Sequence, residues 1–197
     1  MSRKFTGDAA EQKRLLVIGA SAGGIKALVV LLPAFPVTCP LAVMIVLHVG
    51  RDGTDERLDL LRRNCQLPLR EVLDKMPIEA GNVYLAPADY HVMVEADYHF
   101  ALSRGERVQF SRPSIDVCFE SVADVYGERA TAILLTGANR DGSEGLQRMH
   151  ARGARVIIQD PADAEFAAMP EAGLERVTPD QLLSLEGIAQ WIAEETT

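Results

Sequence analysis

Uninterrupted apolar runs alternate along much of the chain with segments whose apolar residues have helical spacing. The short runs predict buried strands over 14–18, 41–47, 131–135 and 155–159. Helices are expected between and after them, over 25–32, 55–64, 114–126, 143–151 and 185–194. Such alternation is typical of the α/β class, so the expected fold is a doubly wound, mostly parallel sheet flanked by helices.

The stretch between residues 82 and 110 breaks this pattern. Its apolar segments are short and are separated by turn-forming residues, at 82–86, 92–95, 99–102 and 108–110. Short segments joined by tight turns are typical of antiparallel strands. We therefore expect a small antiparallel β-hairpin excursion from the α/β domain.

Composition and charge narrow the classes of partner. The chain has 197 residues, of which 48% are hydrophobic, and its 20 Lys and Arg against 28 Asp and Glu leave a formal net charge of −8. Because nucleic acids and anionic membranes both attract clustered basic residues, this charge argues against both as partners. The longest apolar run, Leu41–Leu47, is far shorter than the roughly 18–20 residues of a membrane span, so no membrane insertion is expected.

The first residues differ in character from the rest of the chain. Residues 1–13 are polar and lack the apolar segment of a signal peptide, so we expect a frayed arm followed by one domain over 14–197. The three cysteines, Cys39, Cys65 and Cys118, form no C-x-x-C pair. We interpret them as free thiols in a reducing cytoplasm, with neither a disulfide nor a zinc site.

A candidate nucleophile follows the first predicted strand. The segment from Gly19 to Gly23 matches G-x-S-x-G, with Ser21 at its centre. In this pattern a sharp strand-to-helix turn exposes the serine oxygen, glycines permit a strained backbone, and the helix N-terminus faces developing negative charge. The same residues also fit a plain small-residue turn or a loop that cradles phosphate.

Two further candidates follow two other predicted strands. His48 ends the run over 41–47 and is a candidate general base, although a lone histidine there also fits a polar strand end. Asp141 follows the run over 131–135 and either caps the next helix or orients the imidazole, as the acid of a triad does. Steps of 27 and 93 positions separate Ser21, His48 and Asp141, so only the sheet could unite them. Their chain order differs from that of α/β-hydrolases.

These residues and their surroundings resemble a known family. The family is that of the methylesterase effector domain of CheB, which is the chemotaxis protein-glutamate methylesterase. The resembling segments follow the family's order over about 14–194: Ile18–Gly24, His48, Val83–Pro87, Arg112–Asp116, Leu135–Gly137, Asp141–Gly142, Gln159–Pro161 and Met169–Pro170. The resemblance implies that Ser21 is the nucleophile, that His48 is the general base and then acid, and that Asp141 orients His48. It implies no metal and no organic cofactor.

The resemblance also implies a substrate. This would be a glutamate methyl ester on the cytoplasmic helices of a methylated chemoreceptor, hydrolysed to methanol and a free carboxylate. Many family members also deamidate receptor glutamines through the same acyl-enzyme. The receiver domain that precedes this module in the chemotaxis enzyme is not recognisable in the sequence, and the oligomeric state is left open.

The sequence departs from the family pattern around these residues. Ala22 replaces the usual Thr after the nucleophile, Leu47 replaces the usual Gln before the histidine, and Ala138-Asn139 replaces the usual Met-Gly before the acid. We expect the backbone N–H groups of Ala22 and Ala138 to hold the oxyanion, because a backbone donor survives a change of side chain. Asn139 tolerates a left-handed backbone, so we expect the loop to keep its shape.

Two other functions compete with ester hydrolysis. A nucleotide-binding module would explain the glycine-rich turn, but the turn matches neither G-x-G-x-x-G nor a P-loop. A catalytically weak or inactive scaffold that binds a receptor or signalling partner would explain the departures from the family pattern.

An arginine-rich stretch follows His48. Arg51, Arg62 and Arg63 lie in it, and Arg140 precedes the candidate acid. These arginines form either a solvated surface or a docking site for an acidic substrate. We carry the four forward as candidate docking residues.

Overall fold

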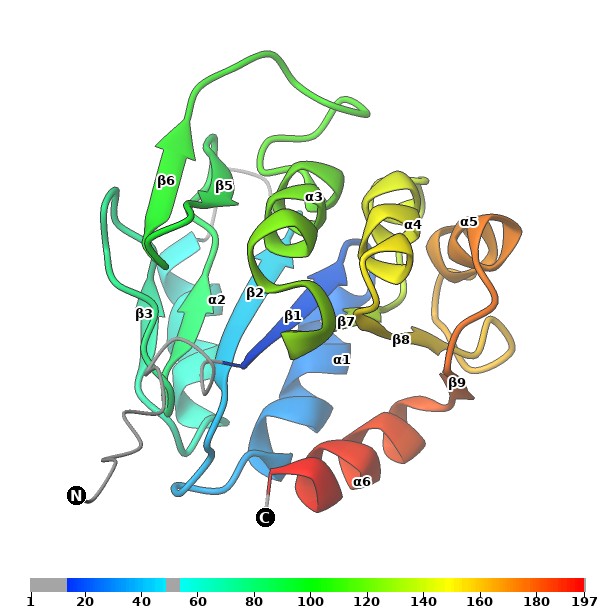
Figure 1. The fold of residues 1–197 in the computed structure, drawn as a ribbon. Coiled ribbons are helices and arrows are strands. Elements are labelled where there is room, and N and C mark those ends of the chain that lie inside the picture. The colour runs from blue at the N-terminus through cyan, green and yellow to red at the C-terminus, as the bar shows by residue number, and fades with distance from the viewer. Residues whose placement is uncertain (1–13, 49–53, 197) are drawn as a thin grey trace, which may run out of the picture.

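A computed structural model describes residues 14–48 and 54–196 (Figure 1). Its main sheet has seven parallel strands in the order β3-β4-β2-β1-β7-β8-β9. These strands are β1 (Leu15–Ala20), β2 (Ala42–Leu47), β3 (Leu69–Glu71), β4 (Val83–Leu85), β7 (Ala130–Leu134), β8 (Arg155–Gln159) and β9 (Gln181–Leu183). The expected arm over 1–13 and the candidate Arg51 lie outside the described residues.

Helices cover both faces of the sheet (Figure 1). One face is covered by α1 (Gly24–Leu31), α2 (Thr54–Arg63) and α6 (Leu185–Glu195). The other is covered by α3 (Ile115–Tyr126), α4 (Ser143–Ala151) and α5 (Ala168–Arg176). The short 3₁₀ helices η1 (Leu32–Ala34) and η2 (Gly127–Arg129) follow α1 and α3. The α/β class and the doubly wound parallel sheet are therefore confirmed.

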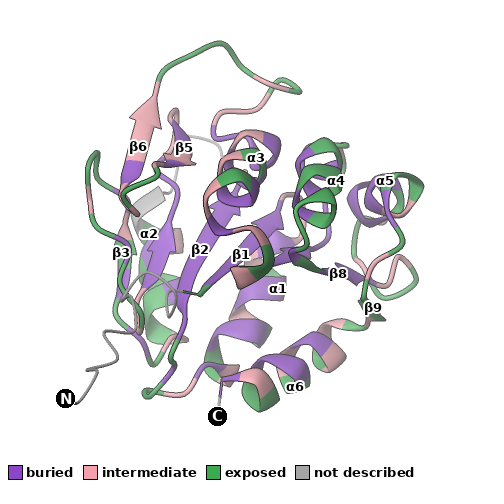
Figure 2. Cartoon of the chain, viewed as in Figure 1, coloured by how far each residue is buried: buried purple, intermediate pink, exposed green. Residues whose placement is uncertain are grey.

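Burial on both faces explains why the central strands are continuous apolar runs. Leu15 and Val17 of β1 pack into one core cluster, whereas Leu16 and Ile18 pack into the other. Figure 2 shows the central strands buried along their length, with exposed residues on the outer sides of the helices. A strand covered on both faces needs apolar residues at every position, which removes the alternation of a half-exposed strand.

The chain enters the sheet at its centre and then fills the two sides in turn. β1 pairs with β2 on one side and with β7 on the other. The first half of the chain builds β2, β3 and β4, and the second half builds β7, β8 and β9. In open α/β sheets, ligands bind beyond the carboxyl ends of the strands at such a switch point. The residues that follow β1, β2 and β7 lie at three neighbouring strand ends.

The expected hairpin excursion is real but smaller than predicted. β5 (His91–Val94) and β6 (Phe100–Ser103) form an antiparallel pair. The segment 82–86 was wrongly grouped with them, because β4 pairs in parallel with β2 and β3 and its residues are all buried. The segment 108–110 forms no strand, and Val108 and Ser111 meet only in an isolated bridge across a tight turn.

Three elements of the sheet and its cover were not predicted. β3 and β9 have three residues each, too few for a periodic signal. α5 contains Pro170 and Gly173, two residues that disfavour helix interiors. Pro170 lies in the first turn, where its missing N–H costs no helical hydrogen bond.

Candidate active site

The backbone around Ser21 is fixed against the end of β7. The Ser21 N–H donates to the carbonyl oxygen of Thr136 at 3.0 Å, and the Thr136 hydroxyl donates to the carbonyl oxygen of Ala22, also at 3.0 Å. The strained backbone expected at this turn belongs to Gly23, with φ of 79°, and Ser21 itself is not among the described residues with positive φ. A Cβ at Gly23 would also lie 3.0 Å from the Thr136 hydroxyl, so the glycine is required on both counts.

His48 lies between the other two candidates. Its N–H donates to the carbonyl oxygen of Ala20 at 3.1 Å, which continues the pairing of β1 with β2. Its ring Nδ1 lies 3.1 Å from Ser21 Oγ, and its Nε2 lies 2.7 Å from Asp141 Oδ2. The side chain is 12% exposed. The structure therefore brings Ser21, His48 and Asp141 together in one hydrogen-bonded row.

This row assigns the tautomer of His48. A carboxylate only accepts hydrogen bonds, so Nε2 carries the proton that it donates to Asp141. In the neutral ring, Nδ1 then presents a lone pair toward the Ser21 hydroxyl. The imidazole is therefore oriented to accept a proton from Ser21.

Asp141 caps a helix, but a different one from the helix expected. The N-cap of α4 is Gly142, and no side chain caps that helix. Asp141 instead accepts from the N–H groups of Ile115 and Asp116, at 2.7 and 3.0 Å, in the first turn of α3. It also accepts from the Ser114 hydroxyl at 2.8 Å. The expected cap of α4 was therefore wrong, and Asp141 both caps α3 and contacts the ring of His48.

These contacts decide the charge of Asp141, which is completely buried. Burial alone would raise its pKa. Hydrogen bonds from His48 and from the N–H groups of Asp116 and Ile115 outweigh burial and lower the pKa below its ordinary value. The positive N-terminal end of α3 acts in the same direction. Asp141 is therefore a carboxylate at neutral pH, although no solvent reaches it.

A second buried carboxyl group, Asp116, lies directly behind Asp141. Its Oδ1 accepts from the Gly145 N–H at 2.7 Å, and its Oδ2 has no hydrogen-bond partner among the described residues. Burial raises the pKa of Asp116 to about 7, and the charge of Asp141 adds to this effect while the Gly145 N–H opposes it. The sequence gives no sign of this environment, because an acid in the first turn of a helix is ordinary.

Two polar side chains near His48 were not predicted as neighbours of the ring. Asn139 Nδ2 and Ser111 Oγ each lie 3.4 Å from His48 Nδ1. Asn139 is not among the described residues with left-handed backbone, so the reason given for its tolerance was wrong. Its Oδ1 instead accepts from the Asp141 N–H at 3.2 Å, which ties the loop to the acid.

The candidate oxyanion donors flank the row of side chains in sequence. Ala22 follows Ser21, and Ala138 lies three positions before Asp141. Neither backbone N–H donates a hydrogen bond to any described residue. Within residues 14–48 and 54–196, both groups therefore lack a hydrogen-bond acceptor.

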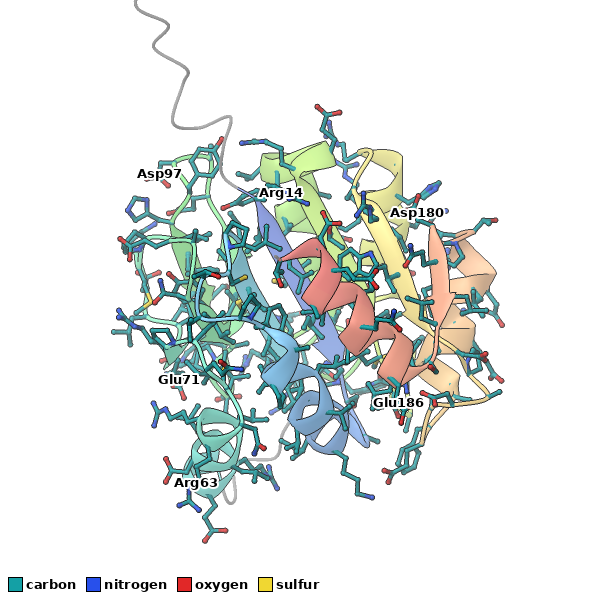
Figure 3. The ribbon with its side chains drawn as sticks, turned by 90° about the horizontal axis from the view of Figure 1, so that it is seen from below. Arg14, Arg63, Glu71, Asp97, Asp180 and Glu186 are labelled. Atoms are coloured by element: carbon teal, nitrogen blue, oxygen red, sulfur yellow. The ribbon has the colours of Figure 1, made fainter. Side chains whose placement is uncertain are left out.

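Two of the candidate docking arginines, Arg62 and Arg63, lie in the last turn of α2, and Arg140 lies in the loop before α4. Arg62 lies 3.6 Å from Asp59 within α2, and its Nε donates to the carbonyl oxygen of Leu69. Arg63 is exposed at the end of α2, at the rim of the molecule in Figure 3. Arg140 pairs with Glu175 of α5 at 3.1 Å. Arg62 and Arg140 are therefore each paired with an acid of the protein itself.

The described part of the chain contains neither a cluster of metal ligands nor a membrane-spanning helix. Over residues 14–48 and 54–196, no three His, Cys, Asp or Glu side chains are grouped as metal ligands would be. The same ranges contain no helix with the length and apolar character needed to cross a membrane. All three cysteines are free thiols, and Cys39 and Cys118 are buried.

Sequence comparisons place this geometry among known proteins. A family model described as CheB methylesterase matches residues 16–192. Two Leptospira interrogans proteins, each named putative protein-glutamate methylesterase/protein-glutamine glutaminase, are 43% identical over 175 residues, which is 89% of this chain and 91% of theirs. A Hahella chejuensis protein-glutamate methylesterase/protein-glutamine glutaminase is 37% identical over 92% of this chain but 52% of its own length.

A solved structure agrees with the sequence comparisons. The catalytic domain of CheB methylesterase from Thermotoga maritima superposes with a TM-score of 0.88 at 27% identity, covering 93% of this chain and 98% of that one. The chain thus spans most of the Leptospira proteins and about half of the Hahella protein. The resemblance found in the sequence is confirmed, and the chain belongs to the CheB methylesterase family.

Proposed function

We propose that this protein is a cytoplasmic protein-glutamate methylesterase that hydrolyses glutamate methyl esters on the helices of a methylated chemoreceptor, and deamidates glutamine by the same route. The observation that carries the proposal is the position of the His48 ring, 3.1 Å from Ser21 Oγ and 2.7 Å from Asp141 Oδ2. The names of the relatives supply the substrate class.

The first half of the reaction makes an acyl-enzyme. Ser21 Oγ attacks the ester carbonyl carbon as its proton passes to Nδ1 of His48. Asp141 stabilises the imidazolium, since it is already ionised and already hydrogen-bonded to Nε2. When the tetrahedral intermediate collapses, His48 returns the proton to the leaving oxygen, and methanol departs.

The second half releases the acid. A water molecule gives a proton to His48 and attacks the acyl carbon, and collapse of the second intermediate returns the proton to Ser21 Oγ. The products are a glutamate carboxylate and the free enzyme. With a glutamine substrate the leaving group is ammonia, and the remaining steps are the same.

The oxyanion is held by backbone groups in this proposal. The N–H groups of Ala22 and Ala138 lack other hydrogen-bond partners among the described residues, so they can donate without breaking existing bonds. Donors fixed before the reaction stabilise the transition state without reorganisation. The family's Thr and Met side chains are not needed for this role, because the backbone supplies both donors.

Methanol release from a methyl-esterified chemoreceptor fragment tests the proposal. We expect Ser21→Ala to lower kcat by about 10³–10⁶-fold. Ser184→Ala, which removes the hydroxyl that caps α6, is the matched control and should keep the rate within about twofold. A serine-directed phosphonate should label wild type once, at Ser21. A Ser21→Ala variant as active as wild type would exclude this mechanism, and a wild type that neither releases methanol nor takes the label would favour a binding scaffold.

A further inference from the structure

Phe110 projects into solvent from a loop that protrudes from the domain. The loop joins β6 to α3 and rises above both elements (Figure 1). Phe110 is 93% exposed, more than any other large apolar residue in the described part of the chain. A single exposed apolar residue is ordinary, but the turn that carries Phe110 and the position of that turn are not.

The turn that carries Phe110 forms against the local preference of its residues. Val108 and Ser111 exchange two backbone hydrogen bonds, of 2.8 and 3.2 Å, and the residues between them, Gln109 and Phe110, have φ of 48° and 63°. A two-residue turn with both residues left-handed selects Asn-Gly. A bulky side chain with positive φ is an outlier, and such strain clusters at functional sites.

The base of this loop is firmly attached to the domain. Arg112 donates to the Asp89 carboxylate at 2.7 Å, and to the carbonyl oxygens of residues 104 and 105 at 3.0 and 2.8 Å. The buried ring of His91 contacts the carbonyl oxygen of Glu106 at 2.8 Å. Since the loop is already ordered, a ligand that binds its tip need not order it first.

The tip of the loop lies beside the reaction centre. Ser111 Oγ is 3.4 Å from His48 Nδ1, the nitrogen that faces Ser21. Consecutive Cα atoms are about 3.8 Å apart, so the Phe110 backbone is one residue from a contact with the row of candidate residues. A polypeptide whose ester side chain reaches Ser21 therefore passes close to residue Phe110.

Two basic side chains, Arg104 and Arg107, belong to the same loop as Phe110. The Arg104 guanidinium lies 4.6 Å from the centre of the Tyr90 ring. Arg107, with a side chain 55% exposed, donates to the carbonyl oxygen of Phe110 at 3.4 Å and lies 3.6 Å from Asp89. Glu106 is an exposed acid of the same loop. The exposed Phe110 ring fits an apolar side chain of a bound segment, and the Arg107 guanidinium beside the Phe110 carbonyl oxygen fits an acidic one.

We propose that Phe110 is a docking residue for the polypeptide part of the substrate: its ring packs against an apolar side chain of the acidic segment that carries the glutamate methyl ester. This inference rests on the proposed function and adds that the enzyme recognises protein sequence as well as the ester. A small ester has no flanking segment, so Phe110 contributes nothing to its hydrolysis.

Substitution of Phe110 separates docking from chemistry. Phe110→Gly removes the ring and also relieves the left-handed backbone, so its melting temperature should equal or exceed that of wild type. We expect kcat/KM for a methyl-esterified chemoreceptor fragment to fall by about tenfold or more, through KM, while kcat/KM for p-nitrophenyl acetate stays within twofold. Phe110→Trp, which keeps an aromatic ring, should restore most of the loss. Leu182→Ala is the control, because it removes an exposed apolar side chain from β9 at the edge of the sheet.

The outcomes distinguish this inference from the function on which it rests. If wild type releases methanol from the receptor fragment and Phe110→Gly matches it, docking through Phe110 is wrong and the esterase function stands. If Phe110→Gly slows both substrates equally, Phe110 acts on the catalytic geometry and the docking role is again wrong. If wild type releases no methanol, both proposals fail together.

Discussion

The raised pKa of the buried Asp116, in the first turn of α3, leads to a quantitative prediction of how the stability of the protein changes with pH. Asp116 has a pKa of about 7 in the folded protein against an ordinary value of 3.8. The folded state therefore holds the Asp116 proton more tightly than the unfolded state does. Since the folded pKa is raised, the stability contributed by this group is complete below pH 3.8 and is lost as the pH rises toward 7. The loss is about 4 kcal/mol at 1.36 kcal/mol per pKa unit.

Asp116→Asn removes this loss, because an amide has the shape of the neutral acid and no proton to release. Its carbonyl oxygen can still accept from the Gly145 N–H, as Asp116 Oδ1 does at 2.7 Å. We expect the variant to gain stability relative to wild type as the pH rises, with the difference widening by about 3 kcal/mol between pH 4.5 and pH 8.5.

Urea unfolding at the two pH values measures this difference. Ser184→Ala is the control, since it removes the hydroxyl that caps α6 and no ionisable group, and it should show no such widening. A difference between Asp116→Asn and wild type that stays constant within about 1 kcal/mol across this range would refute the reasoning, as would a variant that loses stability as the pH rises.

Three further predictions follow from the same region and from the surface. Asp141→Asn should lower kcat by about 10³–10⁴-fold on p-nitrophenyl acetate, since an amide cannot stabilise the imidazolium; activity near wild type would remove Asp141 from the mechanism. Gly145→Ala should cost about 1–3 kcal/mol in urea unfolding, because its Cβ would lie 2.6 Å from Phe119 Cβ and 2.9 Å from the Asp116 carbonyl oxygen. Gly187→Ala should cost less, because its nearest neighbour is the Ser184 hydroxyl at 3.3 Å. Charge reversal at Arg62 and Arg63 should lower kcat/KM for an acidic receptor fragment several-fold at low salt and hardly at all at about 1 M salt; no change at either would end their candidacy for docking.

The sequence was sufficient for the four central strands of the main sheet, β2, β1, β7 and β8, and for the three residues of the row. Strands buried on both faces appear in the sequence as continuous apolar runs, and the carboxyl ends of parallel strands lie at the same edge of the sheet. That combination located Ser21, His48 and Asp141 without any contact being known. β3 and β9 were missed because three residues carry no periodicity, and β4 was assigned to the wrong sheet because pairing partners are not encoded locally.

The surroundings of the site could not be predicted in the same way. Ser111 and Asn139 reach His48 from loops 63 and 91 positions away, and Asp116 is buried only because α4 packs over it. These environments depend on how distant side chains meet. Asp141 shows the same limit, since its position before α4 suggested a cap for that helix, and tertiary packing delivers it to α3 instead.

The entry of the chain at the centre of the sheet has a consequence for how activity is acquired. Ser21 and His48 follow strands from the N-terminal half of the chain. Asp141 follows β7, a strand from the C-terminal half, and lies 93 positions after His48. No fragment that ends before Asp141 contains all three residues, and contacts between such distant positions form late and slowly. Ester hydrolysis therefore begins only after β1 has paired with both β2 and β7. The appearance of hydrolytic activity during refolding then reports that the whole sheet has formed.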